Sequence, residues 1–293
     1  MLAVVVEDAD AVYPVRVDPT FSDANWITMR VIPGANGTVY AAVVDGSGNL
    51  YIGGDFTVVG DVIANRIAKW NGSSWSALGS GMNSYVSALA VSGSDVYAGG
   101  WFTTAGGSAV TNLAKWNGSS WTALGSGIGG DVLTLAVSGT DLYAGGQFAP
   151  RNIARWNGSS WTALGSGMDE VVFALAVSGS DVYAGGYFTR AGGRAANYIA
   201  KWNGSSWSAL GKGMDYDVWA LAVSGSDVYA GGRFTTAGGG AANYIAKWNG
   251  SSWSALGSGM NNWVSVLAVS GSDVYAGGHF TNAGGIAANY IAK

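Results

Sequence analysis

The sequence contains no cysteine, only four prolines and few charged residues. Without cysteine there can be no disulfide framework, no thiolate metal site and no cysteine nucleophile. Charged residues make up 11% of the chain and the net charge is −4, so no basic stripe is available to neutralise the phosphates of a nucleic acid. The acidic balance also argues against an anionic membrane surface. We therefore expect no nucleic-acid partner.

Long apolar runs are missing as well. None approaches the roughly 18 residues of a membrane span, so we expect no membrane insertion. Met1–Val6 has no basic start and is followed by Glu7 and Asp8, which is not the pattern of a signal peptide. A composition rich in Ser, Thr, Asn and Gly favours an extracellular or cell-surface location. The single histidine, His279, excludes a three-histidine site, and we expect no metal and no cofactor.

The sequence is rich in glycine, at 48 of 293 positions, and it repeats itself. A Tyr-x-Gly-Gly-x-Phe motif starts at Tyr51, Tyr97, Tyr143, Tyr183, Tyr229 and Tyr275. A Trp-Asn-Gly-Ser-Ser-Trp motif starts at Trp70, Trp116, Trp156, Trp202 and Trp248. Short strands that repeat with a period of about 40–50 residues indicate the blades of a β-propeller.

One repeat unit is predicted to contain four strands. The innermost covers residues 86–91, the second 96–102, the third 112–116 and the outermost 121–124. Turn residues separate them at Ser92–Asp95 and Asn117-Gly118, and a Gly-rich loop covers residues 103–111. The strands are apolar on both faces, as expected when each blade lies between two others.

The predicted fold is all-β, a six-bladed β-propeller of four-stranded antiparallel blades over residues 21–293. Residues 1–20 do not match the repeat and are interpreted as a lead-in segment. The last unit stops at Lys293, before its outermost strand, whereas Phe21–Trp26 carries two aromatics five residues apart, as Trp70–Trp75 does. We expect this N-terminal strand to complete the last blade and close the ring, which would leave no unpaired sheet edge.

These motifs resemble the kelch repeat family. A kelch unit carries an aromatic-x-Gly-Gly on its second strand and a Trp on its fourth, here Tyr97–Gly100 and Trp121, with the third strand at Leu113–Trp116. The resemblance covers residues 21–293 and implies a propeller that serves as a partner-binding module or as an oxidase scaffold. The oxidase site would need a Cys-modified Tyr and two His, which this chain does not contain. The repeats are also similar to those of uncharacterised bacterial extracellular tandem-repeat proteins.

The units differ from one another mainly in segments expected at one end of the propeller. In an up-and-down blade, the loop between the second and third strands and the connection between blades lie at this end. The candidate ligand-binding residues after the Gly-Gly pair are Asp55, Trp101, Gln147, Tyr187, Arg233 and His279. Those in the connections are Tyr85, Asp169, Glu170, Asp215, Tyr216, Asp217 and Trp263. Aromatics beside hydrogen-bonding groups suit sugar rings or peptide side chains, although neutral drift in exposed loops would also explain the variation.

Three other patterns are interpreted as structural. The two columns of Trp residues are predicted to fill the space between blades. The Asn-Gly-Ser-Ser segments match glycosylation acceptors but are better explained as turns. Asp45–Asn49 is predicted to be a hairpin turn, because it lacks the downstream Glu of a calcium loop.

Together these features predict a non-catalytic binding or structural scaffold module of a larger extracellular protein. Its partner would be an unknown protein or glycan, and the chain would be a monomer or weakly self-associating. A carbohydrate-binding lectin is the alternative. A glycoside hydrolase is the third hypothesis, with a carboxylate pair drawn from Asp55, Asp169, Glu170, Asp215 and Asp217. No catalytic motif is present, and we expect no enzymatic activity.

Overall fold

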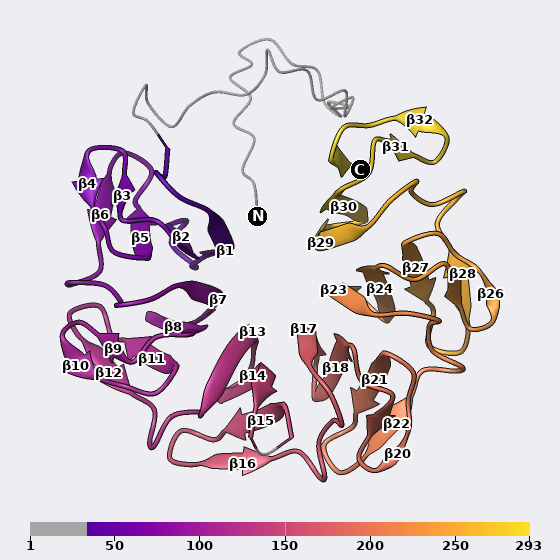
Figure 1. Ribbon diagram of the computed structural model, residues 1–293, viewed down its shortest axis with the longest axis horizontal. Helices are drawn as coiled ribbons and strands as arrows, with labels where there is room; N and C mark the ends of the chain where they lie inside the picture. The colour runs from indigo at the N-terminus through magenta and orange to yellow at the C-terminus, as the bar shows by residue number, and fades with distance from the viewer. Residues whose placement is uncertain (1–33, 150) are drawn as a thin grey trace.

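The computed structural model describes residues 34–149 and 151–293. The regular structure of these residues is entirely β, and its six larger antiparallel sheets are the blades arranged around a centre, which confirms the predicted propeller (Figure 1). We number the blades 1 to 6 along the chain. Within the described residues, no helix is long and apolar enough to cross a membrane. The predicted lead-in over residues 1–20 and closing strand at Phe21–Trp26 lie outside the described residues.

Each blade is built in chain order from the centre outwards. The innermost strands are β1 (Val39–Val44), β7 (Val86–Ser92), β13 (Gly130–Ser138), β17 (Val172–Ser178), β23 (Val218–Ser224) and β29 (Val264–Ser270). The second strands are β2 (Leu50–Gly54), β8 (Asp95–Gly100), β14 (Asp141–Phe148), β18 (Asp181–Gly186), β24 (Asp227–Gly232) and β30 (Asp273–Gly278). The third strands are β5 (Ile67–Trp70), β11 (Leu113–Trp116), β15 (Ile153–Trp156), β21 (Ile199–Trp202), β27 (Ile245–Trp248) and β33 (Ile291–Ala292).

Blades 1 to 5 have a fourth, outermost strand, whereas blade 6 has three described strands. The outermost strands are β6 (Trp75–Ala77), β12 (Trp121–Ala123), β16 (Trp161–Ala163), β22 (Trp207–Ala209) and β28 (Trp253–Ala255). The strands of blade 2 begin and end within two residues of the predicted bounds. Each of the short outer strands begins at its Trp residue.

The Gly-rich loop between the second and third strands is more regular than predicted. In five blades it forms a two-stranded hairpin, and the hairpins are β3 (Val58–Val59) with β4 (Val62–Ile63), β9 (Thr104–Ala105) with β10 (Ser108–Ala109), β19 (Arg190–Ala191) with β20 (Arg194–Ala195), β25 (Thr236–Ala237) with β26 (Gly240–Ala241), and β31 (Asn282–Ala283) with β32 (Ile286–Ala287). Blade 3, whose loop is six residues shorter in the sequence, has no such hairpin among its described residues. The turn of β9 and β10 is made by two glycines with positive φ, Gly106 and Gly107.

The Gly-Gly pair of each repeat allows two close approaches. A Cβ on the second glycine of blade 2, Gly100, would lie 2.2 Å from the carbonyl oxygen of Tyr85, because β7 is bulged at this point. A Cβ on the first glycine, Gly99, would lie 2.5 Å from Cγ1 of Val132 in blade 3. The first glycine therefore lets blades pack together, and the second lets the inner strand bulge.

The outer Trp residues join each blade to the one before it. Trp121 Nε1 donates a hydrogen bond to the Leu78 carbonyl of blade 1 (2.8 Å), and Trp207 Nε1 does the same to Leu164 of blade 3 (2.9 Å). Trp121 also packs on Trp116 of its own blade, with ring centroids 5.4 Å apart. Such aromatic pairs contribute about 0.5–1.5 kcal/mol beyond the area they bury. The Trp columns thus fill the space between blades, as predicted.

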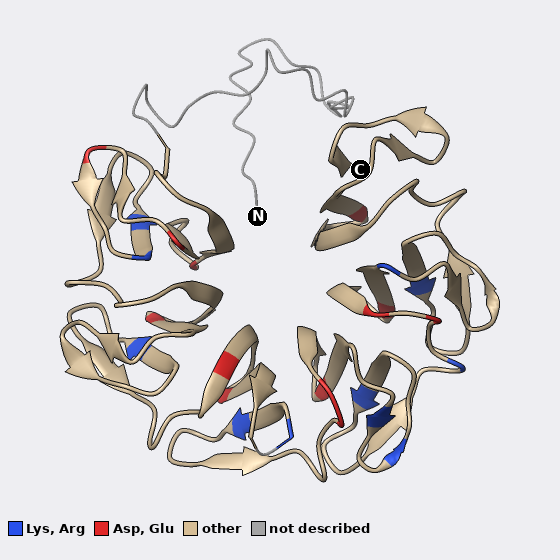
Figure 2. Ribbon diagram, viewed as in Figure 1, with Lys and Arg blue, Asp and Glu red and all other residues tan. Residues whose placement is uncertain are grey.

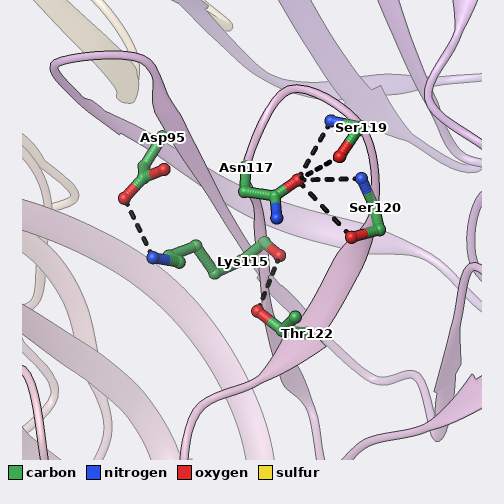
Figure 3. Close-up of polar contacts among 6 residues, drawn as sticks. All are labelled: Asp95, Lys115, Asn117, Ser119, Ser120 and Thr122. Atoms are coloured by element: carbon green, nitrogen blue, oxygen red, sulfur yellow. Dashed lines mark hydrogen bonds and ion pairs between the residues drawn. The ribbon is translucent and has the colours of Figure 1, made fainter.

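The invariant turns lie at the opposite end from the varied loops, and their polar groups form hydrogen bonds within the turn. Asn117 Oδ1 accepts hydrogen bonds from the backbone N–H groups of Ser119 (3.0 Å) and Ser120 (2.9 Å) (Figure 3). Lys115 forms an ion pair with Asp95 at 3.0 Å in the same blade, and this bond raises the pKa of Lys115. Both partners are about one-third exposed, so the pair contributes only about 0–1 kcal/mol.

The Asp45–Asn49 segment is the predicted hairpin turn. Asp45 Oδ1 accepts hydrogen bonds from the backbone of Ser47 (2.9 Å) and Asn49 (3.0 Å), and Asp45 Oδ2 accepts one from the Asn49 amide (2.7 Å). Burial alone would raise the Asp45 pKa, but these hydrogen bonds lower it overall. The Asp45 carboxylate therefore stabilises the turn by accepting hydrogen bonds from it.

Candidate functional site

The segments that vary between blades meet at one end of the propeller. The residue after each Gly-Gly pair lies beside a residue of the incoming connection, and a backbone hydrogen bond usually joins the two. In blade 4 the Tyr187 N–H donates to the Val171 carbonyl (2.9 Å), and in blade 5 the Arg233 N–H donates to Asp217 (3.1 Å). The six neighbouring pairs are Thr38 with Asp55, Tyr85 with Trp101, Asp131 with Gln147, Val171 with Tyr187, Asp217 with Arg233, and Trp263 with His279.

The bulge in each inner strand adds a third varied position. The bulged residues are Tyr40, Ser87, Leu133, Phe173, Trp219 and Ser265. A bulge changes the direction in which a side chain points. In blade 5 it brings Trp219 against Asp217, because Trp219 Nε1 donates a 2.9 Å hydrogen bond to Asp217 Oδ2. The varied positions of the loops are therefore accompanied by one varied position in each inner strand.

The centre of the site is an ion pair in blade 5 between the buried Asp217 and the partly buried Arg233. Asp217 is 1% exposed, and its carboxylate accepts hydrogen bonds from Arg233 Nε (2.9 Å) and Arg233 Nη2 (2.6 Å). Trp219 supplies a further donor to the same carboxylate. The hydrogen bonds to Asp217 raise the pKa of Arg233. A carboxylate with three donors is well satisfied despite its burial, and it fixes the position of the guanidinium.

The Arg233 guanidinium is surrounded by aromatic rings from two connections and one bulge. Its Cζ lies 4.8 Å from the ring centroid of Tyr216, 4.9 Å from that of Trp219 and 5.6 Å from that of Trp263. Cation–π contacts of this kind contribute about 0.5–2 kcal/mol, more when the ion is desolvated. The ion pair and the rings therefore hold one another in place.

The aromatic surface continues on both sides of Arg233. Towards blade 4, the ring centroids of Tyr187 and Tyr216 are 5.9 Å apart, and both rings contact Tyr198. Towards blade 6, Trp263 packs on Trp219 at 5.6 Å and on His279 at 5.7 Å. We call this group the aromatic patch; it comprises Tyr187, Tyr198, Tyr216, Trp219, Arg233, Trp263 and His279. Three of its rings keep about two-fifths of their surface exposed: Tyr187 (43%), Tyr216 (39%) and Trp263 (38%).

Tyr198 was not among the residues predicted from the sequence. It precedes the third strand of blade 4 and has a positive φ of 64°, and its backbone is held at both sides by Gly186 and Phe188. Burial and the neighbouring Tyr187 and Tyr216 raise the pKa of Tyr198. The equivalent positions all have positive φ and vary in identity: Arg66, Asn112, Asn152, Tyr244 and Tyr290. This variation was the sequence signal that could have found Tyr198.

A second, smaller cluster lies in blades 1 to 3. Tyr40 packs edge-on against Tyr85 at 6.2 Å, and the Tyr85 hydroxyl donates to Asp131 Oδ2 at 3.0 Å. Burial, and then the hydrogen bond to Asp131, raise the pKa of Tyr85 to about 12. Burial likewise raises the pKa of Asp131, whose Oδ1 is buried without a hydrogen-bond partner. Tyr40 and Trp101 are about half exposed.

The candidate carboxylates of a hydrolase are mostly engaged in holding loops. Asp215 accepts hydrogen bonds from the N–H groups of Thr235 (2.8 Å) and Thr236 (2.9 Å) and from the Thr235 hydroxyl. Burial acts to raise the Asp215 pKa, but these bonds lower it overall. Asp169 makes the same three bonds in blade 4, whereas Asn83 and Asn261 occupy this position in blades 2 and 6. A position that accepts Asp or Asn without change in geometry does not require an acid.

The remaining predicted residues lie at the same end but outside the aromatic patch. Asp55 pairs with Arg66 at 2.8 Å, while Glu170 and Gln147 are exposed. Charged residues are few and are distributed over the blades, with opposite signs close together (Figure 2). No group of three His, Asp or Glu side chains that could hold a metal ion is found within the residues described.

A hollow of about 550 Å³ opens between blades 1 and 2 on the other side of the repeat. Its lining includes Asp45, Tyr51, Lys69 and Trp116, and a smaller hollow with Tyr97, Lys115 and Trp156 repeats the arrangement one blade further on. These side chains occupy repeated positions of the blades, including the Trp columns. The hollows follow from blade packing, and we place the candidate site on the aromatic patch.

Comparison with known proteins supports the fold but indicates no particular family or function. No family model matches the chain, and no curated protein matches it. The U3-55K structure is similar with a TM-score of 0.62 at 17% identity, covering 86% of this chain and 78% of that one. The Mitotic Checkpoint Complex structure matches with a TM-score of 0.61 at 16% identity, covering 94% and 81%. The computationally designed Ika8 protein matches with a TM-score of 0.51 at 18% identity, covering 81% and 80%.

Proposed function

We propose that this chain is a non-catalytic binding module whose aromatic patch contacts a protein partner. One observation carries the proposal: three consecutive blades contribute exposed rings around the Arg233–Asp217 ion pair, whose carboxylate is buried. Tyr, Trp and Arg are the residue types most enriched in the energetic centres of protein interfaces. Packing around the ion pair fixes these rings before any partner binds, which lowers the entropy lost on association.

The surrounding framework agrees with a scaffold role. The invariant strands and Trp columns provide a rigid support, and the loops that vary lie together at one end. One of the similar structures is that of a protein complex, the Mitotic Checkpoint Complex. The kelch-like motifs and the composition support placing this module in the kelch group and in an extracellular protein.

A lectin is the second candidate. Tyr187, Tyr216 and Trp263 are exposed aromatics beside polar groups, and such rings can stack on the apolar face of a sugar. A hydrolase is less well supported, because Asp169 and Asp215 bind loop backbone as Asn does at the equivalent positions.

Two probes separate these hypotheses: a phage-displayed library of 12-residue peptides and a glycan array. Both are applied to the wild type and to the triple variant Y187A/Y216A/W263A. We expect enriched peptides that bind the wild type and lose at least tenfold in affinity on the variant, with no glycan signal. Glycan signals lost in the variant would establish the lectin instead. Ligands that bind wild type and variant equally, or no ligand from either probe, would overturn the proposed site.

The matched control is the triple variant S94A/S180A/S226A, in the invariant turns at the opposite end. It should bind the selected peptides like the wild type. Circular dichroism melts of both triple variants show whether a loss of binding reflects unfolding.

A further inference from the structure

An ion pair recurs in blades 2 to 6, between the first residue of the second strand and a cation on or next to the third strand. In blade 2, Lys115 Nζ lies 3.0 Å from the Asp95 carboxylate (Figure 3). The other pairs are Arg155 with Asp141, Lys201 with Asp181, Lys247 with Asp227, and Lys293 with Asp273. Each of these five blades therefore supplies its own anion for this cation.

Blade 1 keeps the cation but lacks the carboxylate. Lys69 is equivalent to Lys115, because each lies opposite the tyrosine of the Tyr-x-Gly-Gly motif. Lys69 Nζ lies 5.5 Å from the ring centroid of Tyr51, so the lysine keeps its place against this ring. The position of Asp95 is taken by Asn49. Among residues 34–149 and 151–293, Lys69 consequently forms no ion pair.

The nearby polar side chains of blade 1 are engaged with one another. The Asn49 amide donates a 2.7 Å hydrogen bond to Asp45 Oδ2. Asp45 also accepts hydrogen bonds from the Ser47 N–H, the Asn49 N–H and the Tyr51 hydroxyl. The Asp45 carboxylate is thus satisfied by its own turn and strand, and the Lys69 ammonium is the group left without a counterion.

Lys69 lines the hollow between blades 1 and 2. This hollow has a volume of about 550 Å³, within the range of about 300–1,000 Å³ that is usual for small-molecule sites, whereas the hollow between blades 2 and 3 has only about 270 Å³. Its lining combines the Lys69 ammonium with the hydroxyl groups of Ser47 and Ser94 and with the side chains of Leu78 and Trp116. The hollow therefore offers one positive charge, hydrogen-bonding groups and an aromatic surface.

We propose that this hollow binds a small aromatic carboxylate, whose charged group takes the place that the Asp carboxylate takes in the other blades. The carboxylate accepts charge-assisted hydrogen bonds from Lys69 Nζ, and the ligand's ring packs on the indole of Trp116. Ser47 and Ser94 bond polar substituents of the ring. This site is separate from the aromatic patch and does not depend on the function proposed for that patch.

The test is equilibrium dialysis of the full chain with 4-hydroxybenzoate and with 4-hydroxybenzamide, which has nearly the same shape without the charge. We expect one benzoate site per chain, and affinity for the amide at least tenfold lower. K69M should weaken benzoate binding at least tenfold, whereas K69R, which keeps the charge, should largely retain it. The matched control is K247M, because Lys247 is the equivalent lysine of blade 5 and is already paired with Asp227. It should bind like the wild type.

A second variant acts on the missing anion rather than on the cation. N49D supplies the carboxylate from the chain itself, as in blades 2 to 6, and should weaken benzoate binding to the level of K69M. The variant Y187A/Y216A/W263A should bind benzoate like the wild type, which separates this site from the aromatic patch. Thermal melts of each variant show whether a loss of binding reflects unfolding.

Four results would overturn the proposal. They are the absence of benzoate binding at concentrations up to about 10 mM, equal binding of the benzoate and the amide, undiminished binding to K69M, and undiminished binding to N49D. The last result would show that the ligand does not occupy the place of the Asp carboxylate.

Discussion

Blade 5 places two kinds of residue within one repeat, and they differ in what they determine. Gly231, Gly232 and Trp253 recur in other blades and make the contacts that join strands and blades. Tyr216, Trp219 and Arg233 have no counterpart in the other blades and contact one another at the varied end. The repeated residues specify the fold, and the unique ones specify what that fold presents. The comparison teaches that the proposed binding role rests on an assembly that no single repeat contains, an ion pair inside an aromatic cluster.

The largest effect on stability is expected where a repeated glycine leaves no space for a Cβ atom. G100A places a Cβ 2.2 Å from the Tyr85 carbonyl and must displace the bulge of β7, at a cost of about 3 kcal/mol. G129A is the control, since nothing lies within 4 Å of that Cβ position and its φ is not positive. Urea unfolding should show a much lower midpoint for G100A only. Similar midpoints for the two variants would contradict our explanation of the Gly-Gly pair.

Arg233 is the residue of the varied end for which we expect a clear effect on stability. R233A leaves the buried Asp217 carboxylate with Trp219 as its remaining side-chain donor and should cost about 1–3 kcal/mol. R190A, which removes an exposed arginine bonded to the Gly193 carbonyl, should cost less than about 0.5 kcal/mol. Thermal melts measure both. An R233A protein as stable as R190A would show that the ion pair does not organise the patch.

Asp131 should destabilise the fold slightly at neutral pH. Folding raises its pKa, so its contribution to stability is fully present below the unfolded pKa of about 3.9 and is lost as the pH rises through the folded value. D131N keeps the acceptor for Tyr85 and removes the charge. We expect it to raise stability by less than about 1 kcal/mol at pH 7 and to match the wild type near pH 3. A destabilised D131N at pH 7 would contradict this reasoning.

The smallest effect on stability is expected for the D215N variant. D215N should change stability by less than about 0.5 kcal/mol at pH 7, because Asn83 and Asn261 accept the same backbone hydrogen bonds from their loops and donate their amide N–H to the threonine hydroxyl. The lowered pKa of Asp215 means that its carboxylate stabilises the fold above its unfolded pKa, and that this is lost as the pH falls through the folded value. D215N should therefore flatten the acid limb of a pH–stability curve. D215A, which removes the acceptor, should lose about 1–2 kcal/mol in the same assay.

Much of the architecture could be predicted because the same strand and turn motifs occur in six successive units. The Gly-Gly, Trp and Asn-Gly columns gave the blades, their strands and the end at which variation collects. What could not be predicted depends on contacts between different columns. The pairing of Arg233 with Asp217, the inclusion of Trp219 through a bulge, and the left-handed Tyr198 arise only when blades are placed side by side. The five hairpins between the second and third strands were not predicted, because two-residue strands in a Gly-rich loop give no periodic signal.

The most direct test of the division between framework and binding surface is a saturation library over residues 213–259, scored for survival of limited proteolysis. The account predicts that Gly231, Gly232 and Trp253 tolerate almost no substitution, whereas Tyr216 accepts most residues and Arg233 accepts only those that satisfy Asp217. Equal tolerance at the repeated and the unique positions would contradict it.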